Sequence, residues 1–413
     1  SGYNVLLGHG AGASMTTGNR NIAIGVSAMD GFDTEAHNLG IGVAALGGSV
    51  AGGEYNVAVG NYALDALTSG DRNTVVGYQA ATALTTSNDN VIIGYNAAEN
   101  ATTLLENVVI GHEACGAGVM TAGYGVYIGK EAGLNKTSGG SNVFIGYQSG
   151  EQCTTAARSI FIGSTAGDDH DTENDNIGIG SGALGGSIAG GEFNLAIGNG
   201  SGDLITSGDR NVLLGYQAGD GLTTGTGNVF IGYDSTLGSV TDKTGNISIG
   251  DQNQHNNGNY EMTIGYQIQG LGGNSVTIGS PSGKVYNVFS LNNTWVQTSD
   301  ERAKNIIGTN TVGLDFINEC RVVDFTWKPN NELPTTFNEH REENYKDTTT
   351  VCNGFIAQEV KSALEKVGVD TEKYGVWDEQ LDGVQSVSRE MFILPLVNAV
   401  KELSAKVKAL EEA

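Results

Sequence analysis

Residues 73–77 read NTVVG and residues 90–94 read NVIIG, and this pattern of Asn, three mostly apolar residues and Gly recurs along most of the chain. Most copies are 17 or 18 residues apart, and the spacing falls to 15 and 14 at the end. A fixed short period of this kind indicates a solenoid or stacked array. The 17 copies begin at residues 4, 21, 38, 56, 73, 90, 107, 125, 142, 159, 176, 194, 211, 228, 246, 261 and 275.

Each copy is too short for a helix and predicts one short β-strand. Its V-x-I alternation has period two, so we expect the Val and Ile positions to form the buried face of the strand. The following Gly permits a turn with positive φ. A second short stretch and a polar loop complete the repeat. Each repeat should therefore form one coil of a β-roll, with equivalent Asn and Val/Ile positions aligned along the stack.

A longer period lies over the short one. Residues 38–80 and 176–218 are identical at 28 of 43 positions without a gap, at an offset of 138. The repeats therefore contain an internal duplication of eight coils.

The apolar content of one coil is small. A coil of 17 residues holds three or four large apolar side chains, so a single-chain roll would have a thin core and an exposed apolar face. We therefore expect several chains to associate about a long axis. The N-x-x-I-G-x-x-A pattern resembles the head repeats of trimeric autotransporter adhesins and the related collar-like repeats of phage tail fibres. Over residues 4–279, this resemblance implies a homotrimeric, left-handed parallel β-roll, although the usual adhesin period is about 14.

The composition changes near Ser299. Only 6 of the 63 glycines follow this residue, whereas 13 of the 21 Lys and Arg residues do. We therefore divide the chain into a repeat shaft at 1–283, connecting strands at 284–298 and a small α+β domain at 299–413. The fold is expected to be mainly β.

The overall composition excludes several classes of function. A net charge of −25 argues against nucleic acid or an anionic membrane surface as a partner. No apolar run reaches the roughly 18 residues of a membrane span. The chain begins inside the repeat pattern without Met or a signal peptide, so we expect a fragment of a longer protein. The cysteines show no metal-ligand spacing, which predicts idle thiols in a reducing cytoplasm and no cofactor.

The second part of the chain has mixed α/β patterns. Residues 322–328 alternate like a strand, 330–350 are polar and irregular, and 354–368 read as a strand and then an amphipathic helix. The last helix is expected at 391–412. An a/d heptad seam on it predicts association of helices; the alternative is a lone amphipathic helix packed on its own domain. The seam residues are Ile393, Leu396, Val400, Leu403, Val407 and Leu410.

Two features of the repeats have alternative interpretations. Asp169, Asp171, Glu173 and Asp175 gather in one loop and are a weak calcium candidate, or form a solvated acidic loop. A set of tyrosines that recurs just after the turn Gly either stacks along the shaft or presents a glycan-binding surface. These are Tyr62, Tyr78, Tyr147, Tyr216 and Tyr233.

Four motifs follow one another in the second part: SDERAKNII, DFTWKPN, GFIAQEV and LPLVNAVKEL. In this order they resemble the C-terminal intramolecular chaperone, auto-processing domain of phage tail spikes, tail fibres and endosialidases. The resemblance covers about residues 299–413. It implies a domain that helps three chains to register and fold and then cuts itself off.

The same resemblance implies the cleavage site. The bond would be Thr298–Ser299, with Ser299 as the nucleophile, Lys304 as its partner, and Asp300 and Arg302 at the other motif positions. A serine hydroxyl needs a nearby base, and lysine can serve only when its amine is neutral. Arg302 could lower the pKa of Lys304 and bind the developing oxyanion. The alternative interpretation of this stretch is a helix N-cap formed by Ser299 or Asp300.

These patterns lead to a functional prediction. The chain should be a homotrimeric phage tail fibre or spike, folded and processed in the host bacterial cytoplasm and located in the virion. A missing N-terminal part would bind other tail or baseplate proteins, and the shaft would bind a host receptor such as a glycan. The alternatives are a bacterial trimeric surface adhesin and a glycan-degrading tail-spike enzyme.

Overall fold

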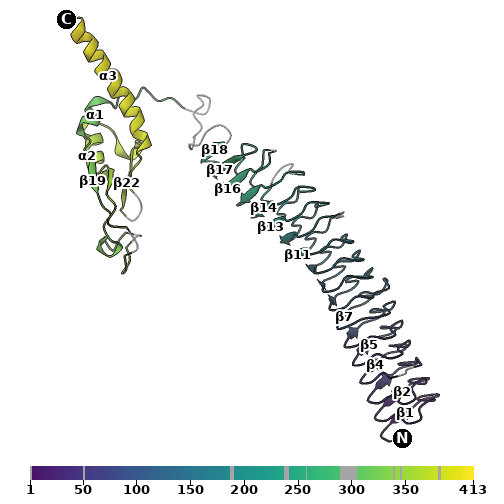
Figure 1. Cartoon of the computed structure of the whole chain (residues 1–413). Helices are drawn as coiled ribbons and strands as arrows, with labels where there is room; N and C mark the ends of the chain where they lie inside the picture. Colours follow the sequence, from purple (N-terminus) through teal and green to yellow (C-terminus); the bar gives the residue numbers. More distant parts are fainter. Residues whose placement is uncertain are drawn as a thin grey trace. The chain divides into compact units, whose positions relative to one another are not determined.

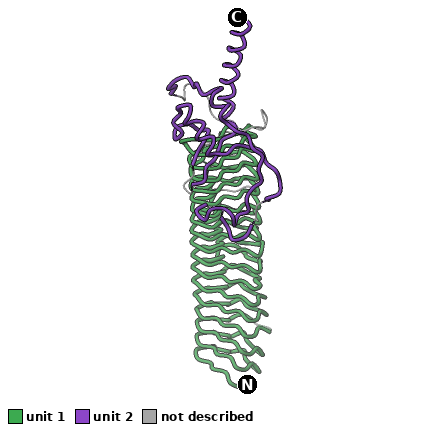
Figure 2. The backbone as a smooth tube through the Cα atoms, turned by 90° about the vertical axis from the view of Figure 1, so that its left-hand side faces the viewer, with its two compact units in different colours: residues 1–298 green, residues 299–413 purple. Residues whose placement is uncertain are grey.

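The chain divides into two compact units, residues 1–298 and residues 299–413, shown in different colours in Figure 2. The computed structural model describes residues 2–49, 52–186, 190–236, 241–256, 258–288, 305–337, 340–344, 347–379 and 383–413.

The first unit is a stack of coils, each contributing one short strand to a continuous sheet (Figures 1 and 2). Neighbouring strands are parallel and in register, so that Thr74 lies opposite Val91 and Val76 opposite Ile93. The predicted parallel β-roll of about 17 repeats is thereby confirmed. Its strands are β1 (Val5–Leu7), β2 (Ile22–Ile24), β3 (Leu39–Ile41), β4 (Val57–Val59), β5 (Thr74–Val76), β6 (Val91–Ile93), β7 (Val108–Ile110), β8 (Val126–Ile128), β9 (Val143–Ile145), β10 (Ile160–Ile162), β11 (Ile177–Ile179), β12 (Leu195–Ile197), β13 (Val212–Leu214), β14 (Val229–Ile231), β15 (Ile247–Ile249), β16 (Met262–Gly265) and β17 (Ser275–Ser280).

A hairpin ends the stack. Strand β18 (Gly283–Val288) turns back on β17 and pairs with it antiparallel. The exposed edge that a further coil would have used is therefore occupied by the chain itself.

The prediction that the Val and Ile positions face the interior of the coil was wrong. In β5 the central residue Val75 is fully buried, whereas the flanking Thr74 and Val76 are partly exposed. The same pattern holds for most strands of the stack. The coil is narrow and turns directly after the strand, so only the central side chain fits inside. The Val and Ile positions of the V-x-I pattern consequently point out of the coil.

Small residues from the second stretch of each repeat share the interior with these central side chains. Pairs such as Ala80 and Ala81 are fully buried. A large side chain from the loop, such as Leu84, closes the coil. One chain thus fills the inside of its own coils and leaves an apolar column outside them.

The recurring Asn forms a buried hydrogen-bond ladder. The Oδ1 atom of Asn73 accepts from the backbone N–H of Asn90 at 3.2 Å, and the Nδ2 atom of Asn73 donates to the Ser87 carbonyl at 2.7 Å. The side chain therefore ties two coils together and satisfies a loop carbonyl inside the protein. This double role explains why Asn opens most of the repeats.

The Gly after each strand is required by its backbone. Gly77 has a φ of 145°, and a Cβ at this position would collide with the carbonyl oxygen of Gly94 in the next coil. Only glycine allows this conformation together with such a close approach of coils.

One coil carries a lysine at a position where several other coils carry large apolar side chains. Lys136 occupies the repeat position of Leu84 and is fully buried. Its Nζ donates to the Ala156 carbonyl. Burial lowers the pKa of Lys136 from 10.5 to about 8, because the charged amine is removed from water.

We predict that Lys136→Met stabilises the shaft. The Lys136 amine has a lower pKa in the folded state than in the unfolded state, so protonation of the amine favours unfolding. This destabilisation is fully present below pH 8 and is lost as the pH rises to 10.5. The shift corresponds to roughly 3 kcal/mol at pH 7. The unfolding midpoint of Lys136→Met should therefore exceed that of wild type at pH 7, and the difference should shrink toward pH 10.5. A midpoint below wild type at pH 7 would contradict this; Leu84→Met, at the equivalent position, is the matched control.

In its described residues the second unit is a small α+β unit with two antiparallel strand pairs and three α-helices, as Figure 1 shows in outline. Its core is built around Phe316, Val360, Leu364, Val376 and Phe392. The elements are α1 (Leu314–Glu319), β19 (Val323–Phe325), η2 (Asn330–Glu332), β20 (Cys352–Gly354), α2 (Ala357–Lys366), η3 (Thr371–Lys373), β21 (Trp377–Glu379), β22 (Gln385–Val387), η4 (Glu390–Phe392) and α3 (Ile393–Glu411).

Most of these elements lie where the sequence patterns place them. The strand predicted at 322–328 is shorter, and α2 is followed by Gly368 with a positive φ of 78°. Helix α1 was not predicted. It has six residues and no side-chain cap, so it lacks the usual sequence signals.

Candidate functional sites

The acidic loop of the shaft uses most of its carboxylates within the chain. Asp175 accepts two hydrogen bonds from Arg158, at 2.7 and 2.6 Å. Asp171 accepts from the Thr154 hydroxyl of the preceding coil. Glu173 is only 4 % exposed. These contacts favour a structural role for the loop, and calcium binding stays a prediction.

Glu173 clamps its own turn to the next coil. Its carboxylate accepts from the backbone N–H groups of Asp171, Thr172 and Gly190 at 3.0–3.1 Å. Glu35, 138 residues earlier, makes the equivalent bonds to Asp33, Thr34 and Gly52. The duplication therefore preserves a buried carboxylate that holds two coils together.

We predict that Glu173→Ala destabilises the shaft whether or not calcium is present. The substitution leaves the N–H groups of Asp171, Thr172 and Gly190 without their charged acceptor, at a cost of about 1–3 kcal/mol. Asp169→Ala is the control, because Asp169 is exposed. Thermal unfolding with and without millimolar calcium measures both effects. A calcium-dependent stabilisation that Asp169→Ala removes would instead support an ion site in the loop.

A second group of possible metal ligands was missed by the sequence analysis. Within the described part of the chain, ligand atoms of His112, Glu113 and Glu131 lie within 4.8 Å of one another. Glu131, however, is bound by Lys130 at 2.9 Å and by Gln148 at 2.8 Å. The Lys130 ammonium already neutralises the Glu131 carboxylate, so we interpret this group as a cluster of ion pairs.

Four of the five recurring tyrosines contact a tyrosine ring of a neighbouring coil, as one of the two interpretations predicted, whereas Tyr147 lies against Lys130. The rings of Tyr78 and Tyr95 are 5.4 Å apart and nearly parallel, and Tyr216 and Tyr233 are 5.2 Å apart. Tyr62 meets Tyr78 edge-on. Stacked rings cover one another's faces, which are the surfaces that a sugar ring would need.

The predicted cleavage residues lie outside the described residues. Thr298, Ser299, Asp300, Arg302 and Lys304 all belong to the stretch 289–304. The Ser-Lys pair and the cleavage bond therefore stay predictions.

Helix α3 presents its predicted seam to solvent. The six seam side chains, from Ile393 to Leu410, are between 46 % and 78 % exposed. Pro395 and Ala399, on another side of the helix, are buried against the unit. The seam is therefore not the face that packs on its own domain, which argues against the alternative of a lone amphipathic helix.

The side of α3 turned toward the unit holds the chain segment that leads into α1. The Nδ2 atom of Asn398 donates to the carbonyls of Asn310 and Val312 at 2.9 and 3.0 Å. Glu402, one turn further, accepts from the N–H of Leu314 at 3.3 Å. Two residues of the LPLVNAVKEL motif thus have a structural task that the sequence did not reveal.

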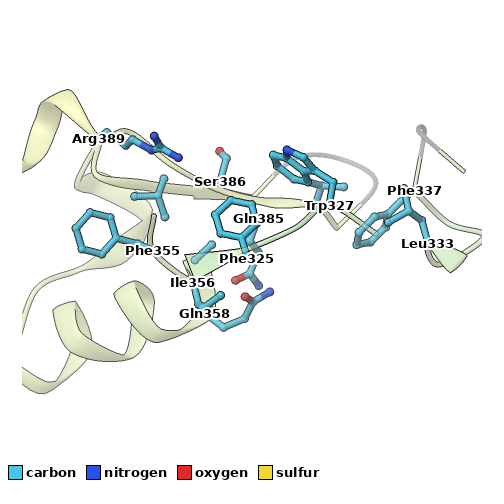
Figure 3. A pocket seen from close by; sticks show the side chains of 13 residues that line it. Phe325, Trp327, Leu333, Phe337, Phe355, Ile356, Gln358, Gln385, Ser386 and Arg389 are labelled. Atoms are coloured by element: carbon cyan, nitrogen blue, oxygen red, sulfur yellow. The ribbon is translucent and has the colours of Figure 1, made fainter. Parts of the chain in front are cut away.

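Two other motifs converge on one apolar cavity of about 510 Å³ (Figure 3). Phe325 and Trp327 come from DFTWKPN, and Phe355 and Ile356 come from GFIAQEV. Arg389 stands at this cavity and donates to the Asn353 carbonyl at 3.0 Å. The two motifs are therefore neighbours in space and form one feature of the unit.

Fold and site together define a β-solenoid shaft followed by a small α+β unit with an exposed helical seam. Residues 299–369 match the model of the peptidase S74 family, described as the chaperone of endosialidase. The resemblance that the motifs carried is thereby confirmed for this part of the chain. The match begins at Ser299, the residue predicted to follow the cleaved bond, and ends before α3.

Neither the curated proteins nor the solved structures contain a significant match to this chain. In the described part of the chain, no helix has the length and apolar character needed to cross a bilayer.

Proposed function

We propose that the chain is a tail fibre or spike protein of a bacteriophage whose C-terminal unit directs folding and then releases itself. The observation that carries this proposal is the match of residues 299–369 to the chaperone of endosialidase, directly after a β-solenoid shaft. After cleavage, Thr298 is the last residue of the finished fibre. Each chain catalyses this cleavage only once.

The proposed cleavage follows from the chemistry of the SDERAK motif. The Ser299 hydroxyl attacks the carbonyl carbon of Thr298, and neutral Lys304 takes up the hydroxyl proton. The peptide C–N bond breaks, the amine of Ser299 takes a proton, and the shaft is left as an ester of the Ser299 oxygen. Water then hydrolyses the ester. Arg302 stabilises the negative charge on the carbonyl oxygen, and Asp300 supports the arrangement.

The active assembly is proposed to be a homotrimer. Two unpartnered apolar surfaces support it: the outward Val and Ile positions of the strands and the seam of α3. Along the shaft, Val5, Leu7, Ile22, Ile93, Ile197 and Ile249 are among those that are more than a third exposed. Exposed apolar rows of this length are unusual on a monomer and fit association of parallel chains.

Association before cutting has a physical purpose. Parallel β-structure with many non-local contacts folds slowly, and unregistered chains expose strand edges. A helical seam that associates first raises the effective concentration of the three shafts. Once the chaperone unit has been released, the fibre can no longer unfold by the reverse of its folding pathway. The finished fibre is therefore kinetically stable.

Host attachment completes the proposal. The shaft presents the receptor surface in the virion, and the fibre binds other tail or baseplate proteins. Folding and cutting take place in the host cytoplasm.

Native mass spectrometry of the purified product tests the assembly, with trimeric shafts and a separate chaperone fragment as the expected species. Monomeric uncut chain of 42.8 kDa under folding conditions would refute the proposal. Incubation with host polysaccharide distinguishes the enzyme alternative, since a fibre should not shorten it.

A further inference from the structure

The segment between the cleavage motif and α1 is fastened to the rest of its unit at a few points only. Residues 305–311 are exposed and have no regular structure. Within the described part of the chain, residues 305–309 make no hydrogen bond. The first fastened residue is Asn310, six positions after Lys304. The contacts that bind residues 310–314 to the rest of the unit therefore determine where the motif at residues 299–304 is attached.

Helix α3 supplies most of that attachment. Asn398 binds the carbonyls of both Asn310 and Val312 through one amide nitrogen. Glu402 receives the N–H of Leu314. Outside this helix, Asn310 donates from Nδ2 to the Tyr374 hydroxyl at 2.9 Å. Every second residue from Asn310 to Leu314 is thus bound to Asn398 or Glu402. These two side chains are one helical turn apart.

The approach of segment and helix is close. A Cβ on Gly313 would collide with the carboxylate of Glu402 and would lie 3.2 Å from the Asn398 Cβ. Val312 and Gly313 are buried, unlike the residues before them. The backbone of the segment therefore lies directly on α3.

The same helix carries the seam on its other side. With 3.6 residues per turn, Asn398 and Glu402 lie roughly opposite the row that runs from Ile393 to Leu410. One rigid helix of 19 residues thus has a face for the segment and a face for other chains.

We propose that Asn398 and Glu402 are positioning residues for self-cleavage, which fasten the segment behind the Ser299–Lys304 motif to the helix that associates the chains. They touch neither the scissile bond nor the nucleophile. Association along the seam fixes α3, and α3 fixes the segment through these two side chains. The inference rests on the proposed self-cleavage and adds a physical link between assembly and cutting.

The test compares cleavage rate and assembly in full-length variants. Asn398→Ala and Glu402→Ala should slow the appearance of the 299–413 fragment by about ten- to a hundred-fold, because small misplacements near a reacting bond reduce rates by such factors. Trimers should form as in wild type. Glu402→Gln keeps an acceptor oxygen for Leu314 and should recover much of the rate. Lys401→Ala, exposed on the same helix, is the matched control.

Hydrogen exchange separates the failure of this inference from the failure of the cleavage proposal. In uncut Ser299→Ala protein, the Leu314 amide should be protected, and Asn398→Ala or Glu402→Ala added to it should remove that protection. If the wild type cuts and both single variants cut at its rate, the positioning role is refuted although self-cleavage stands. If the wild type never cuts, both proposals fall, whatever the exchange shows.

Discussion

Ser299→Ala should leave the chain whole, at 42.8 kDa, while the shaft still folds and associates. The substitution removes the only oxygen that the proposed mechanism uses to attack the Thr298 carbonyl. Loss of a nucleophile reduces such reactions by orders of magnitude, so no fragment should accumulate over days. A denaturing gel and the intact mass measure the result.

The control for this variant lies in the same motif. Ser299→Thr keeps a hydroxyl and should cut measurably, although more slowly because of the added methyl group. Lys304→Ala should also leave the chain whole, since the hydroxyl then lacks its base. Fragmentation of Ser299→Ala at the same bond and rate as wild type would show that another group, or a host protease, performs the cut.

Charge placed on the seam of α3 should prevent both assembly and cutting. The double variant Leu403→Asp and Val407→Asp introduces two carboxylates on side chains that are 47 % and 52 % exposed in a single chain. The fold of the single unit should therefore tolerate them. Burial of these carboxylates between helices would cost several kcal/mol per chain, so the trimer should be lost. Native mass spectrometry and the denaturing gel report the two effects.

Ala405→Asp provides the matched charge change away from the seam. Ala405 is exposed and lies on the opposite side of α3, so the trimer and the cleavage should both survive. If the double variant still forms trimers and releases its fragment, the seam does not hold the chains together. If it stays monomeric yet cuts normally, cleavage does not depend on assembly.

The repeat made the shaft predictable, because one short pattern is tested many times along the chain. Strand, turn Gly and parallel stacking all followed from NTVVG and its copies. The direction of the side chains did not, since period two identifies two faces and says nothing of which is inside. The coil is so narrow that only the central side chain of each strand, such as Val75, fits inside it. The expectation of an exposed apolar column was met nonetheless, by the Val and Ile positions themselves.

The second unit was less predictable because its important contacts join residues far apart in sequence. The heptad pattern located the seam, but nothing local shows that Asn398 and Glu402 bind residues 86 to 88 positions earlier. Similarly, the contacts that Asp171, Glu173 and Asp175 make with Thr154, Arg158 and backbone N–H groups could not be read from the acidic sequence of their loop.

Self-cleavage between Thr298 and Ser299 can be tested directly on the purified protein. Purified, refolded chain should be analysed by intact mass and by sequencing the N-terminus of the smaller product. We expect a fragment of residues 299–413 that begins Ser-Asp-Glu-Arg, and a shaft that ends at Thr298. A chain that stays whole after assembling into trimers, or a fragment that begins elsewhere, would contradict it.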